Sequence, residues 1–362
     1  MSTILKLAAA VYVAWRLYKL LPQKKWLRKA VMSVYCAGAL AFILASFSLV
    51  DYLPMGLAAV LYVFGNGWFV FLMYATIFLG VLELLRLMKV LPDKLLEKNA
   101  VITIALFAII AGLMVYGTIH NRQKYRVEVQ IASPKIDKPV KVVLLSDVHA
   151  GYVTRYKQLS SIVNMVNREQ PDLVLLGGDL VDRSLVAAQK DHDANCLRRL
   201  NAPVYACLGN HEYYADEEES AKFYEQCGIT LLKDSVATVC GLTLVGRSVE
   251  MDPDEEERTP LYKILRKADR SKFIILLDHI PGDFVEAQLE KVDFQFSGHT
   301  HGGQFWPVTW LTHLGCEDPY GAMTKGGTHY YVTSGIGVWG VPMRIGTRSE
   351  YLVLTLVPQT QP

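Results

Sequence analysis

The chain has 362 residues, 51% of them hydrophobic, and a formal net charge of +2 at pH 7. It is longer than one ordinary domain and more hydrophobic than a typical soluble protein, which excludes a single soluble domain of even composition. Before residue 120 there are eleven Lys and Arg against four Asp and Glu, and from residue 120 onward there are 26 against 31. The sequence therefore divides into a basic, apolar N-terminal part and an acidic globular part.

Residues 1–120 are predicted to form a membrane anchor with about four transmembrane helices, at 3–21, 30–50, 58–82 and 99–119. The stretches 30–50, 52–82 and 99–119 contain no Asp, Glu, Lys or Arg, and each is long enough to cross about 30 Å of hydrocarbon as a helix. Residues 3–21 carry Lys6, Arg16 and Lys19, whose charges would have to reach the headgroups. For this stretch a helix lying on the membrane surface is the alternative. A cleaved signal peptide is disfavoured because the positive residues follow the apolar run.

The basic residues between the spans predict the orientation of the anchor. The stretch "QKKWLRK" (23–29) and the connection 84–98, with four basic residues, flank the same side, whereas the connection at Asp51 has no Lys or Arg. Basic loops favour the cytoplasmic side. Arg122 and Lys124, just after the last span, argue mildly the other way. We expect an integral protein of the cytoplasmic or plasma membrane whose globular domain is extracytoplasmic.

Residues 121–139 are expected to be a linker and residues 140–362 a globular α/β domain. Continuous apolar runs such as "VKVVLLSD" (140–147) and "PDLVLLGGD" (171–179) predict buried strands, and apolar residues at helical spacing lie between them. Strands interleaved with helices predict sheets covered on both faces, with functional groups at the carboxyl ends of the strands. The five cysteines of this domain have no CxxC spacing, which favours buried thiols over a zinc or redox site and leaves one disulfide open.

Polar side chains of the types that bind metals follow successive hydrophobic strands, at the point where each strand ends: Asp147 and His149, Asp179, Asn210 and His211, His279, and His299 and His301. Any one of them alone is better explained as a cap, a turn residue or a satisfied core residue. Together they would place many ionisable groups at one edge of the sheets, which is costly without a counter-charge. A pair of divalent cations would supply that charge.

The order of these motifs resembles that of the calcineurin-like metallophosphoesterases, in particular their membrane-anchored branch. The residues that carry the resemblance are D-x-H at Asp147 and His149, G-D-x-V-D-R at 178–183, G-N-H-E at 209–212, His279, and G-H-x-H at 298–301. The resemblance covers roughly residues 140 to 355. It implies an α/β sandwich of two mixed sheets with helices outside.

The resemblance also implies a site for two metal ions. Asp147, His149 and His301 would bind one ion, Asn210, His279 and His299 would bind the other, and Asp179 would bridge them. The mixed nitrogen and oxygen donors suit Mn, Fe or Zn, and the sequence does not choose among these.

Three further residues take catalytic roles by the same resemblance. His211 would contact the phosphate and protonate the leaving oxygen, Asp182 would orient the His211 ring, and Arg183 would hold the phosphate. The alternative for Asp182 and Arg183 is a helix-capping acid and a surface base.

Three functions are compatible with these observations. The favoured one is a membrane-anchored, two-metal hydrolase of phosphodiester or pyrophosphate bonds. A metal-binding membrane receptor or scaffold without catalysis is disfavoured because no expected ligand position is missing. A nuclease of the same superfamily is disfavoured because the domain is acidic, and binding a nucleic acid needs clustered Lys and Arg. The sequence names neither the physiological substrate nor the oligomeric state.

Three of the six tryptophans, Trp306, Trp310 and Trp339, flank the predicted metal edge. One interpretation is that they pack beneath the loops as core. The other is an apolar lip beside the metals that holds an acyl chain or lies at headgroup level. The short connection between the last span and "VKVVLLSD" favours the second, so we predict a substrate with a lipid portion.

Overall fold

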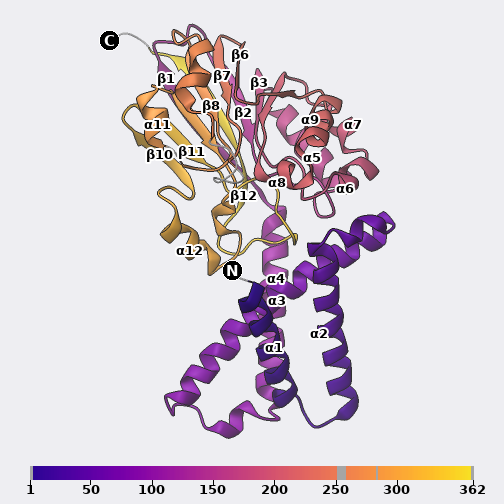
Figure 1. The fold of residues 1–362 in the computed structure, drawn as a ribbon. Coiled ribbons are helices and arrows are strands. Elements are labelled where there is room, and N and C mark those ends of the chain that lie inside the picture. Colours follow the sequence, from indigo (N-terminus) through magenta and orange to yellow (C-terminus); the bar gives the residue numbers. More distant parts are fainter. Residues whose placement is uncertain (1–2, 251–257, 283, 360–362) are drawn as a thin grey trace. The chain divides into compact units, whose positions relative to one another are not determined.

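The computed structural model describes residues 3–250, 258–282 and 284–359, and its fold is drawn in Figure 1. The chain divides into two compact units, Met1–Thr118 and Ile119–Pro362. The first is helical and the second contains both sheets.

The first unit contains four α-helices and two short 3-10 helices within its described residues: α1 (Thr3–Leu20), α2 (Lys25–Ser46), η1 (Leu49–Tyr52), α3 (Met55–Leu87), η2 (Asp93–Leu96) and α4 (Ala100–Arg122), the last of which continues into the second unit. Three of them, α2, α3 and α4, are long and apolar enough to cross a membrane. Helix α1 also forms, but its three basic residues keep it outside that set. The fourth span stays a prediction.

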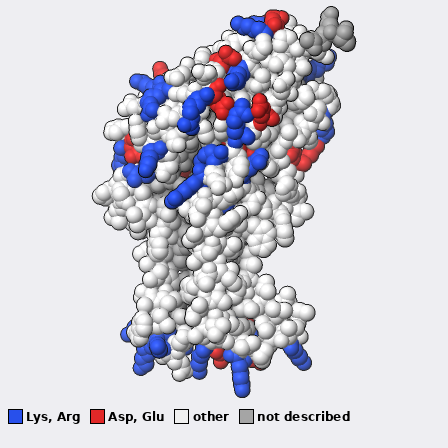
Figure 2. All heavy atoms as spheres, turned by 180° about the vertical axis from the view of Figure 1, so that it is seen from behind, with Lys and Arg blue, Asp and Glu red and all other residues white. Residues whose placement is uncertain are grey.

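Charged side chains in the helical unit are either paired inside it or lie toward an end of the helices. Arg16 of α1 is 7% exposed and forms an ion pair with Glu83 of α3, so that its charge is neutralised inside the unit. On the face drawn in Figure 2, Lys and Arg side chains gather at the free end of the helices, and the middle of the helices shows no Lys, Arg, Asp or Glu. The loops that follow α1 and α3 both contribute to the basic residues of the unit, with Lys24, Lys89 and Lys94.

The second unit is built on two six-stranded mixed sheets. The first has the order β1-β12-β2-β3-β4-β5 and the second the order β10-β11-β9-β8-β7-β6. The strands of the first sheet are β1 (Lys124–Ser133), β2 (Val140–Leu145), β3 (Leu173–Gly177), β4 (Val204–Cys207), β5 (Thr230–Leu231) and β12 (Ser349–Pro358). Those of the second are β6 (Ser235–Val239), β7 (Leu242–Gly246), β8 (Phe273–Leu277), β9 (Phe294–Ser297), β10 (Gly321–Lys325) and β11 (Thr328–Val332).

The two sheets pack face to face, with helices on their outer faces (Figure 1). One buried cluster joins Leu144 and Leu175 of the first sheet to Ile275 and Phe296 of the second. The first sheet is covered by α5 (Tyr156–Arg168), α6 (Leu185–Lys190), α7 (Asp193–Leu197), α8 (Asn210–Ala215) and α9 (Glu217–Gln226), and the second by α10 (Leu261–Ile264), η3 (Leu265–Lys267) and α11 (Phe284–Leu289). The predicted sandwich of two mixed sheets between helices is confirmed.

The structure differs from the sequence-based expectation between residues 121 and 139. This range was expected to be a linker, but residues 124–133 form β1, which pairs in parallel with β12 along ten residues. Every second residue of β1 packs toward the domain, with Ile131 and Ser133 buried. The reason is that β12 pairs with β2 on one side and leaves its other edge open, and β1 satisfies the backbone groups of that edge.

The cysteines are free thiols throughout the described residues. Cys196, Cys207 and Cys227 are buried, and Cys240 and Cys316 are partly exposed. Burial raises the pKa of Cys227 to about 12, so this thiol stays protonated and unreactive. The interpretation of the domain cysteines as single thiols therefore agrees with the fold.

Candidate metal centre and active site

The seven residues predicted to bind metals all lie in loops or helix starts that follow strands. Strands β2, β3 and β4 run parallel in one sheet and β8 and β9 run parallel in the other, so their carboxyl ends meet at one edge of the sandwich. These residues are here called the ligand cluster: Asp147, His149, Asp179, Asn210, His279, His299 and His301. Six of them are at most 5% exposed, whereas His299 is exposed.

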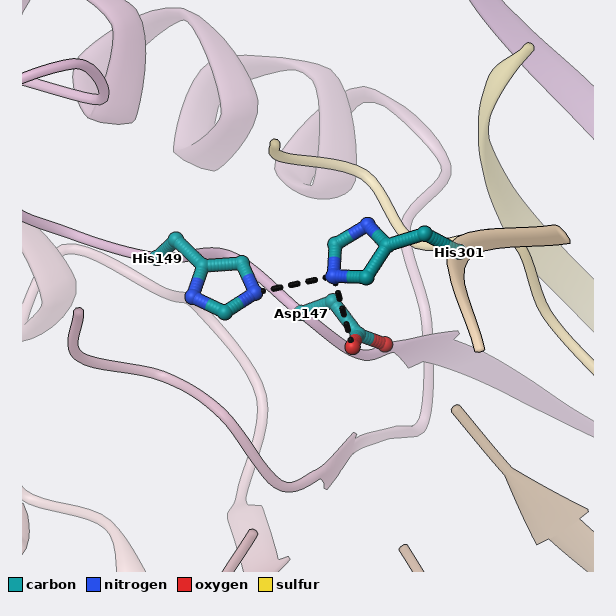
Figure 3. A group of neighbouring side chains, drawn as sticks. All are labelled: Asp147, His149 and His301. Atoms are coloured by element: carbon teal, nitrogen blue, oxygen red, sulfur yellow. Dashed lines mark hydrogen bonds and ion pairs between the residues drawn. The ribbon is translucent and has the colours of Figure 1, made fainter. Parts of the chain in front are cut away.

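One group within the cluster joins the two sheets. The ring of His301, from η4 (His301–Gly303), faces both His149 and Asp147, which follow β2 (Figure 3). Its Nε2 atom is 3.0 Å from His149 Nε2 and 3.2 Å from Asp147 Oδ1. Three atoms with available lone pairs thus converge on one point, which is the arrangement of a metal site.

A second group is formed by Asp179, His279 and His299. His279 Nε2 lies 3.2 Å from Asp179 Oδ2, and His299 Nδ1 lies 2.6 Å from Asn210 Oδ1. Asp179 Oδ2 is also 3.9 Å from His149 Nε2, a member of the first group. Asp179 therefore lies between the two groups, as expected of a residue that serves both.

The backbone of the ligand cluster is held in unusual conformations. Asp147, His149, Asp179, His299 and His301 all have positive φ angles, between 49° and 65°. Side chains other than glycine visit this left-handed region uncommonly, and each such residue stores strain that its surroundings must hold. Five strained residues in one cluster indicate that the positions of these side chains are maintained for a function.

Two motif glycines let the backbone approach the cluster closely. A Cβ atom on Gly209 would lie 2.2 Å from Asp179 Oδ1, and one on Gly298 would lie 2.3 Å from Asp147 Oδ2. Neither position has room for any other residue, because these contacts are with buried carboxylates. The glycines of the G-N-H-E and G-H-x-H motifs are therefore required by the geometry of the site.

The electrostatic balance favours the metal-binding forms of most of the ligands. Burial raises the pKa of the Asp147 and Asp179 carboxyls, but the neighbouring histidines, His301 and His279, outweigh it and hold both below the ordinary value. Burial lowers the pKa of His149 to about 3, and partial burial of the His299 ring, together with the charge of His279, lowers the pKa of His299 to about 4, so both rings are neutral at pH 7. Ionised carboxylates and neutral imidazoles are the forms that bind cations.

His279 behaves differently from the other rings. Burial alone would lower its pKa, but the charge of Asp179 raises it to about 10. Its Nδ1 lies 2.7 Å from the carbonyl oxygen of Gly177, which fixes the ring. Nε2 is buried and has no hydrogen-bonding geometry to any described residue, although Asp179 Oδ2 is close. A buried nitrogen aimed at a carboxylate in this way fits a cation held between them.

His211 and Asp182 lie beside the cluster as a pair. His211 Nδ1 is 3.2 Å from Asp182 Oδ1, and the His211 ring lies 4.5 Å from the His149 ring. Burial lowers the pKa of His211, but the charges of Asp179 and Asp182 outweigh it, so that the pKa is raised above its ordinary value. His211 is therefore suited to carry a proton near neutral pH.

A pocket of about 340 Å³ opens over the cluster, lined by Asp179, Arg183, Asn210, His211, Tyr214, His299, His301 and Trp339. Arg183 is exposed at its wall. Trp339 is 37% exposed and its ring packs on Phe305, so it belongs to the pocket wall as well as to the surface. Four residues of the ligand cluster, together with His211 and Arg183, thus line one cavity, and Asp182 contacts His211.

Two buried residues that support the cluster were given no role in the sequence analysis. Glu212 accepts hydrogen bonds from the backbone nitrogens of Asp179 (3.0 Å), Val181 (3.0 Å) and Gly209 (2.7 Å), and so ties two ligand loops together. The position of Glu212 directly after "GNH" was the sequence signal that could have identified it. Arg344 is 0% exposed and donates to the carbonyl oxygens of His301 (3.1 Å) and Gly337 (2.7 Å). No sequence signal marks Arg344, which follows the apolar segment "GIGVWGVPM".

Comparison with known proteins gives a consistent result. A family model described as calcineurin-like phosphoesterase matches residues 140–303. An uncharacterized metallophosphoesterase of Helicobacter pylori (strain J99) is 34% identical over 238 residues, covering 65% of this chain and 64% of that protein. This chain therefore spans slightly less than two thirds of the length of that relative.

Two further matches come from zebrafish and from a thermophilic bacterium. A Danio rerio transmembrane protein with metallophosphoesterase domain is 30% identical over 361 residues, covering 92% of this chain and 81% of that protein. Among solved structures, that of a 5'-nucleotidase precursor from Thermus thermophilus matches with a TM-score of 0.36 and 18% identity, covering 61% of this chain and 54% of that chain.

Proposed function

The chain belongs to the calcineurin-like phosphoesterase family, and on that premise we propose that it is a membrane-anchored hydrolase that uses two divalent metal ions to cleave a phosphodiester or pyrophosphate bond. The observation that carries the proposal is the position of the Asp179 carboxylate between two groups of ligand atoms. Its Oδ2 atom lies 3.2 Å from His279 in one group and 3.9 Å from His149 in the other.

The residues of the ligand cluster have the donor chemistry that two ions require. One ion would be held by Asp147, His149 and His301. The other ion would be held by Asn210, His279 and His299, and Asp179 would bind both ions. Nitrogen and oxygen donors in this mixture suit Mn, Fe or Zn. Two such ions supply the positive charge that stabilises an in-line displacement at phosphorus.

The protein side chains around the pocket account for proton transfer and substrate binding. The raised pKa of His211 favours its protonated form, and with Nδ1 turned toward Asp182 the other ring nitrogen can donate a proton to the leaving oxygen. Asp182 fixes the ring orientation. Arg183 at the pocket wall binds a phosphate oxygen through its guanidinium group.

Three apolar helices support attachment to a membrane, and the printed name of the zebrafish relative describes a transmembrane protein. The basic residues in the loops after α1 and α3 support a cytoplasmic position for both loops, because positive charge is retained on that side. Helix α4 would then deliver the second unit outside the cytoplasmic membrane. Trp339 at the pocket wall supports a substrate that carries a lipid portion.

The activity is tested with the purified full chain in detergent, stripped of metal and then refilled separately with Mn, Fe or Zn. The substrates are an aryl phosphodiester, an aryl phosphate monoester and a lipid pyrophosphate. We expect metal-dependent hydrolysis of the diester or the pyrophosphate that exceeds hydrolysis of the monoester. Activity that survives complete chelation would show that the two-metal mechanism is wrong. No turnover with any metal would favour the receptor or scaffold.

The orientation is tested with protease added to intact cells whose outer layer has been made permeable. We expect digestion after residue 122, while the loop around Lys24 is protected. The control is the same treatment after the inner membrane has been lysed, which should expose both regions. Protection of the second unit in intact cells would reverse the orientation.

A further inference from the structure

Helix α12 (Val308–Gly315) has the opposite amphipathic character to that expected of a soluble domain. Thr309, on its inner side, is 7% exposed, whereas Trp310, Leu311 and Leu314 are 61%, 63% and 84% exposed. Surface helices of soluble domains normally turn their apolar side to the core and their polar side to water. Two neighbours, Trp306 and Val308, are also more than one third exposed. These five apolar residues are here called the α12 patch: Trp306, Val308, Trp310, Leu311 and Leu314.

The α12 patch is continuous and lacks charge. The rings of Trp306 and Trp310 contact each other edge to face, with their centroids 5.5 Å apart. From residue 299 to residue 316 the sequence has no Asp, Glu, Lys or Arg. Contiguous apolar surface of this kind marks a site of interaction with an apolar partner.

The position of the patch identifies that partner. His120 and Asn121, in the last turn of α4, belong to the second unit, and both are fixed to the segment 344–349. His120 Nε2 lies 2.9 Å from the carbonyl oxygen of Thr347, and Ser349 Oγ donates to Asn121 Oδ1 at 2.9 Å. The point where the last apolar helix ends is therefore attached to this segment.

The α12 patch begins on the same segment. The backbone nitrogen of Trp306 donates to the carbonyl oxygen of Ile345 at 2.7 Å, only two residues from Thr347. Arg122 and Lys124 are the first charged residues after the apolar part of α4, as expected where a helix leaves hydrocarbon for headgroups. The end of α4 and the start of the patch are thus held within one short stretch of the second unit.

We propose that the α12 patch inserts into the headgroup region and the upper acyl chains of the bilayer that α4 crosses, so that its partner is a lipid surface. Tryptophan and leucine side chains are suited to that depth, because they are apolar and the indole N–H can still reach a headgroup. The inference rests on the proposed function only for the membrane attachment and does not require phosphoesterase activity.

Docking of the patch brings the pocket to the membrane surface. Gln304 Nε2 donates to the carbonyl oxygen of Trp339 at 3.0 Å, and the Trp339 ring packs against Phe305. Residues 304–306 therefore connect the pocket wall directly to the patch. A phosphate group attached to a lipid would meet the ligand cluster without leaving the headgroup layer.

The test measures the depth of single nitroxide labels in the full chain, reconstituted in lipid nanodiscs. The background carries Cys36→Ser, Cys240→Ser and Cys316→Ser, which removes the thiols that are not fully buried. The label is placed by Leu314→Cys in the patch. The aqueous control is Leu289→Cys at the end of α11, an exposed leucine of the same unit, and the lipid control is Val60→Cys, an exposed residue in α3.

We expect label 314 to collide with oxygen in preference to a water-soluble nickel chelate, as label 60 does, whereas label 289 prefers the chelate. In detergent, the Leu314→Cys variant should keep wild-type turnover of the aryl diester, which shows that it is folded. A second variant, Leu311→Cys, repeats the measurement if the first does not fold.

Three outcomes would overturn the proposal. If label 314 is as accessible to the chelate as label 289 while label 60 reports lipid, the patch lies in water although the chain is anchored. If label 314 is shielded from both reagents, the patch binds protein, either a second copy or another chain. If label 60 also reports water, the membrane attachment itself fails, and it fails separately from any loss of hydrolysis.

Discussion

Two neighbouring parts of the second unit reverse the usual distribution of side chains, in opposite directions. The ligand cluster buries ionisable groups, with Asp147 and His279 both 0% exposed, whereas the α12 patch exposes apolar groups, with Leu314 at 84%. His301, the last residue of the cluster, and Trp310, in the patch, are only nine positions apart in the chain. The ligand cluster costs free energy because charged groups are removed from water, and the α12 patch costs free energy because apolar side chains are exposed to water.

The ligand cluster and the α12 patch differ in which interactions can offset this free-energy cost. Inside the cluster the carboxylates and imidazoles compensate one another in part, as in the contact of His301 with Asp147, and bound cations would complete the balance. In the α12 patch the side chains of Trp310, Leu311 and Leu314 stay 61%, 63% and 84% exposed. Both parts are therefore expected to depend on something outside the chain, an ion in one case and a lipid surface in the other.

The largest effect should come from removing the shared ligand of the cluster. Asp179→Ala, or Asn210→Ala, should lower kcat/KM by about 10³-fold or more, because at least one cation would lose a ligand. Bound metal, measured by elemental analysis, should fall in parallel. Asp269→Ala, which removes an exposed carboxylate, is the matched control and should leave both quantities unchanged. An Asp179→Ala enzyme with more than a tenth of normal activity would contradict the assignment.

His211 should separate proton transfer from metal binding within the same cluster. His211→Ala is expected to keep the wild-type metal content and to lose about 10²–10⁴-fold in kcat, because the leaving oxygen no longer receives a proton. Asp182→Asn should lose less, since the ring is only misoriented. Elemental analysis and steady-state kinetics on the same samples decide this. Wild-type turnover by the His211→Ala enzyme would exclude the role.

Arg344 should affect the ligand cluster through the backbone of His301 and of the loop 335–337, whose carbonyl oxygens it binds. Arg344→Lys cannot hold several carbonyl oxygens at once, so the metal concentration for half-maximal activity should rise about 10–100-fold. Saturating metal should restore kcat, which loss of folding would not allow. Arg348→Lys, a partly exposed arginine four residues later, is the control. An unchanged metal dependence would show that Arg344 only stabilises its own loop.

Asp193 is a buried carboxylate without the compensation found in the cluster. It is 0% exposed, and neither carboxylate oxygen has a hydrogen-bond partner among the described residues. Burial, with the nearby charge of Asp191, raises its pKa to about 7. The pKa of Asp193 is thus higher in the folded state than in the unfolded state. Its contribution to the free energy of unfolding is therefore fully present below about pH 4, the ordinary pKa of Asp, and is lost as the pH rises toward 7.

Asp193→Asn should abolish that pH dependence. The variant should be more stable than the wild type at pH 8, by about 1–3 kcal/mol, because no charge is left buried. Thermal melting of the full chain in detergent between pH 4 and pH 8 measures this. Parallel melting curves for the two proteins over the whole range would show that Asp193 is compensated after all.

The smallest effect is expected in the α12 patch. Leu314→Ser should change the stability of the detergent-solubilised chain by no more than about 0.5 kcal/mol, because the residue is 84% exposed. Leu175→Ala, a fully buried leucine between the sheets, should cost about 2–5 kcal/mol in the same melting experiment. A large loss with Leu314→Ser would mean that the patch is covered by another part of the chain.

Much of the fold and of the candidate site could be predicted because each depends on local sequence. Continuous apolar runs form buried strands wherever both faces are covered, and polar residues after those runs necessarily lie at strand ends. Asp147 follows β2 and Asp179 follows β3, so parallel pairing alone brings them to one edge. The metal roles of these residues stay predictions until an ion is measured.

Other features could not be predicted because they depend on pairing between distant segments. The pairing of β1 with β12 joins residues more than 200 positions apart, and nothing in "KYRVEVQIAS" names its partner. Arg344 reaches His301 only through the fold of its own loop. The exposure of the tryptophans depends on the same loops: Trp306, Trp310 and Trp339 are 38%, 61% and 37% exposed, so none of them is buried core, and their contact with lipid stays a prediction.

The insertion of β12 between β1 and β2 has a consequence for the synthesis of the protein. β1 and β2 are the first two strands to leave the ribosome, yet they do not pair with each other, and both pair with residues 349–358. Contacts of such long sequence separation form late and slowly. During synthesis the first sheet of the nascent chain therefore presents two open strand edges until residues 349–358 have left the ribosome.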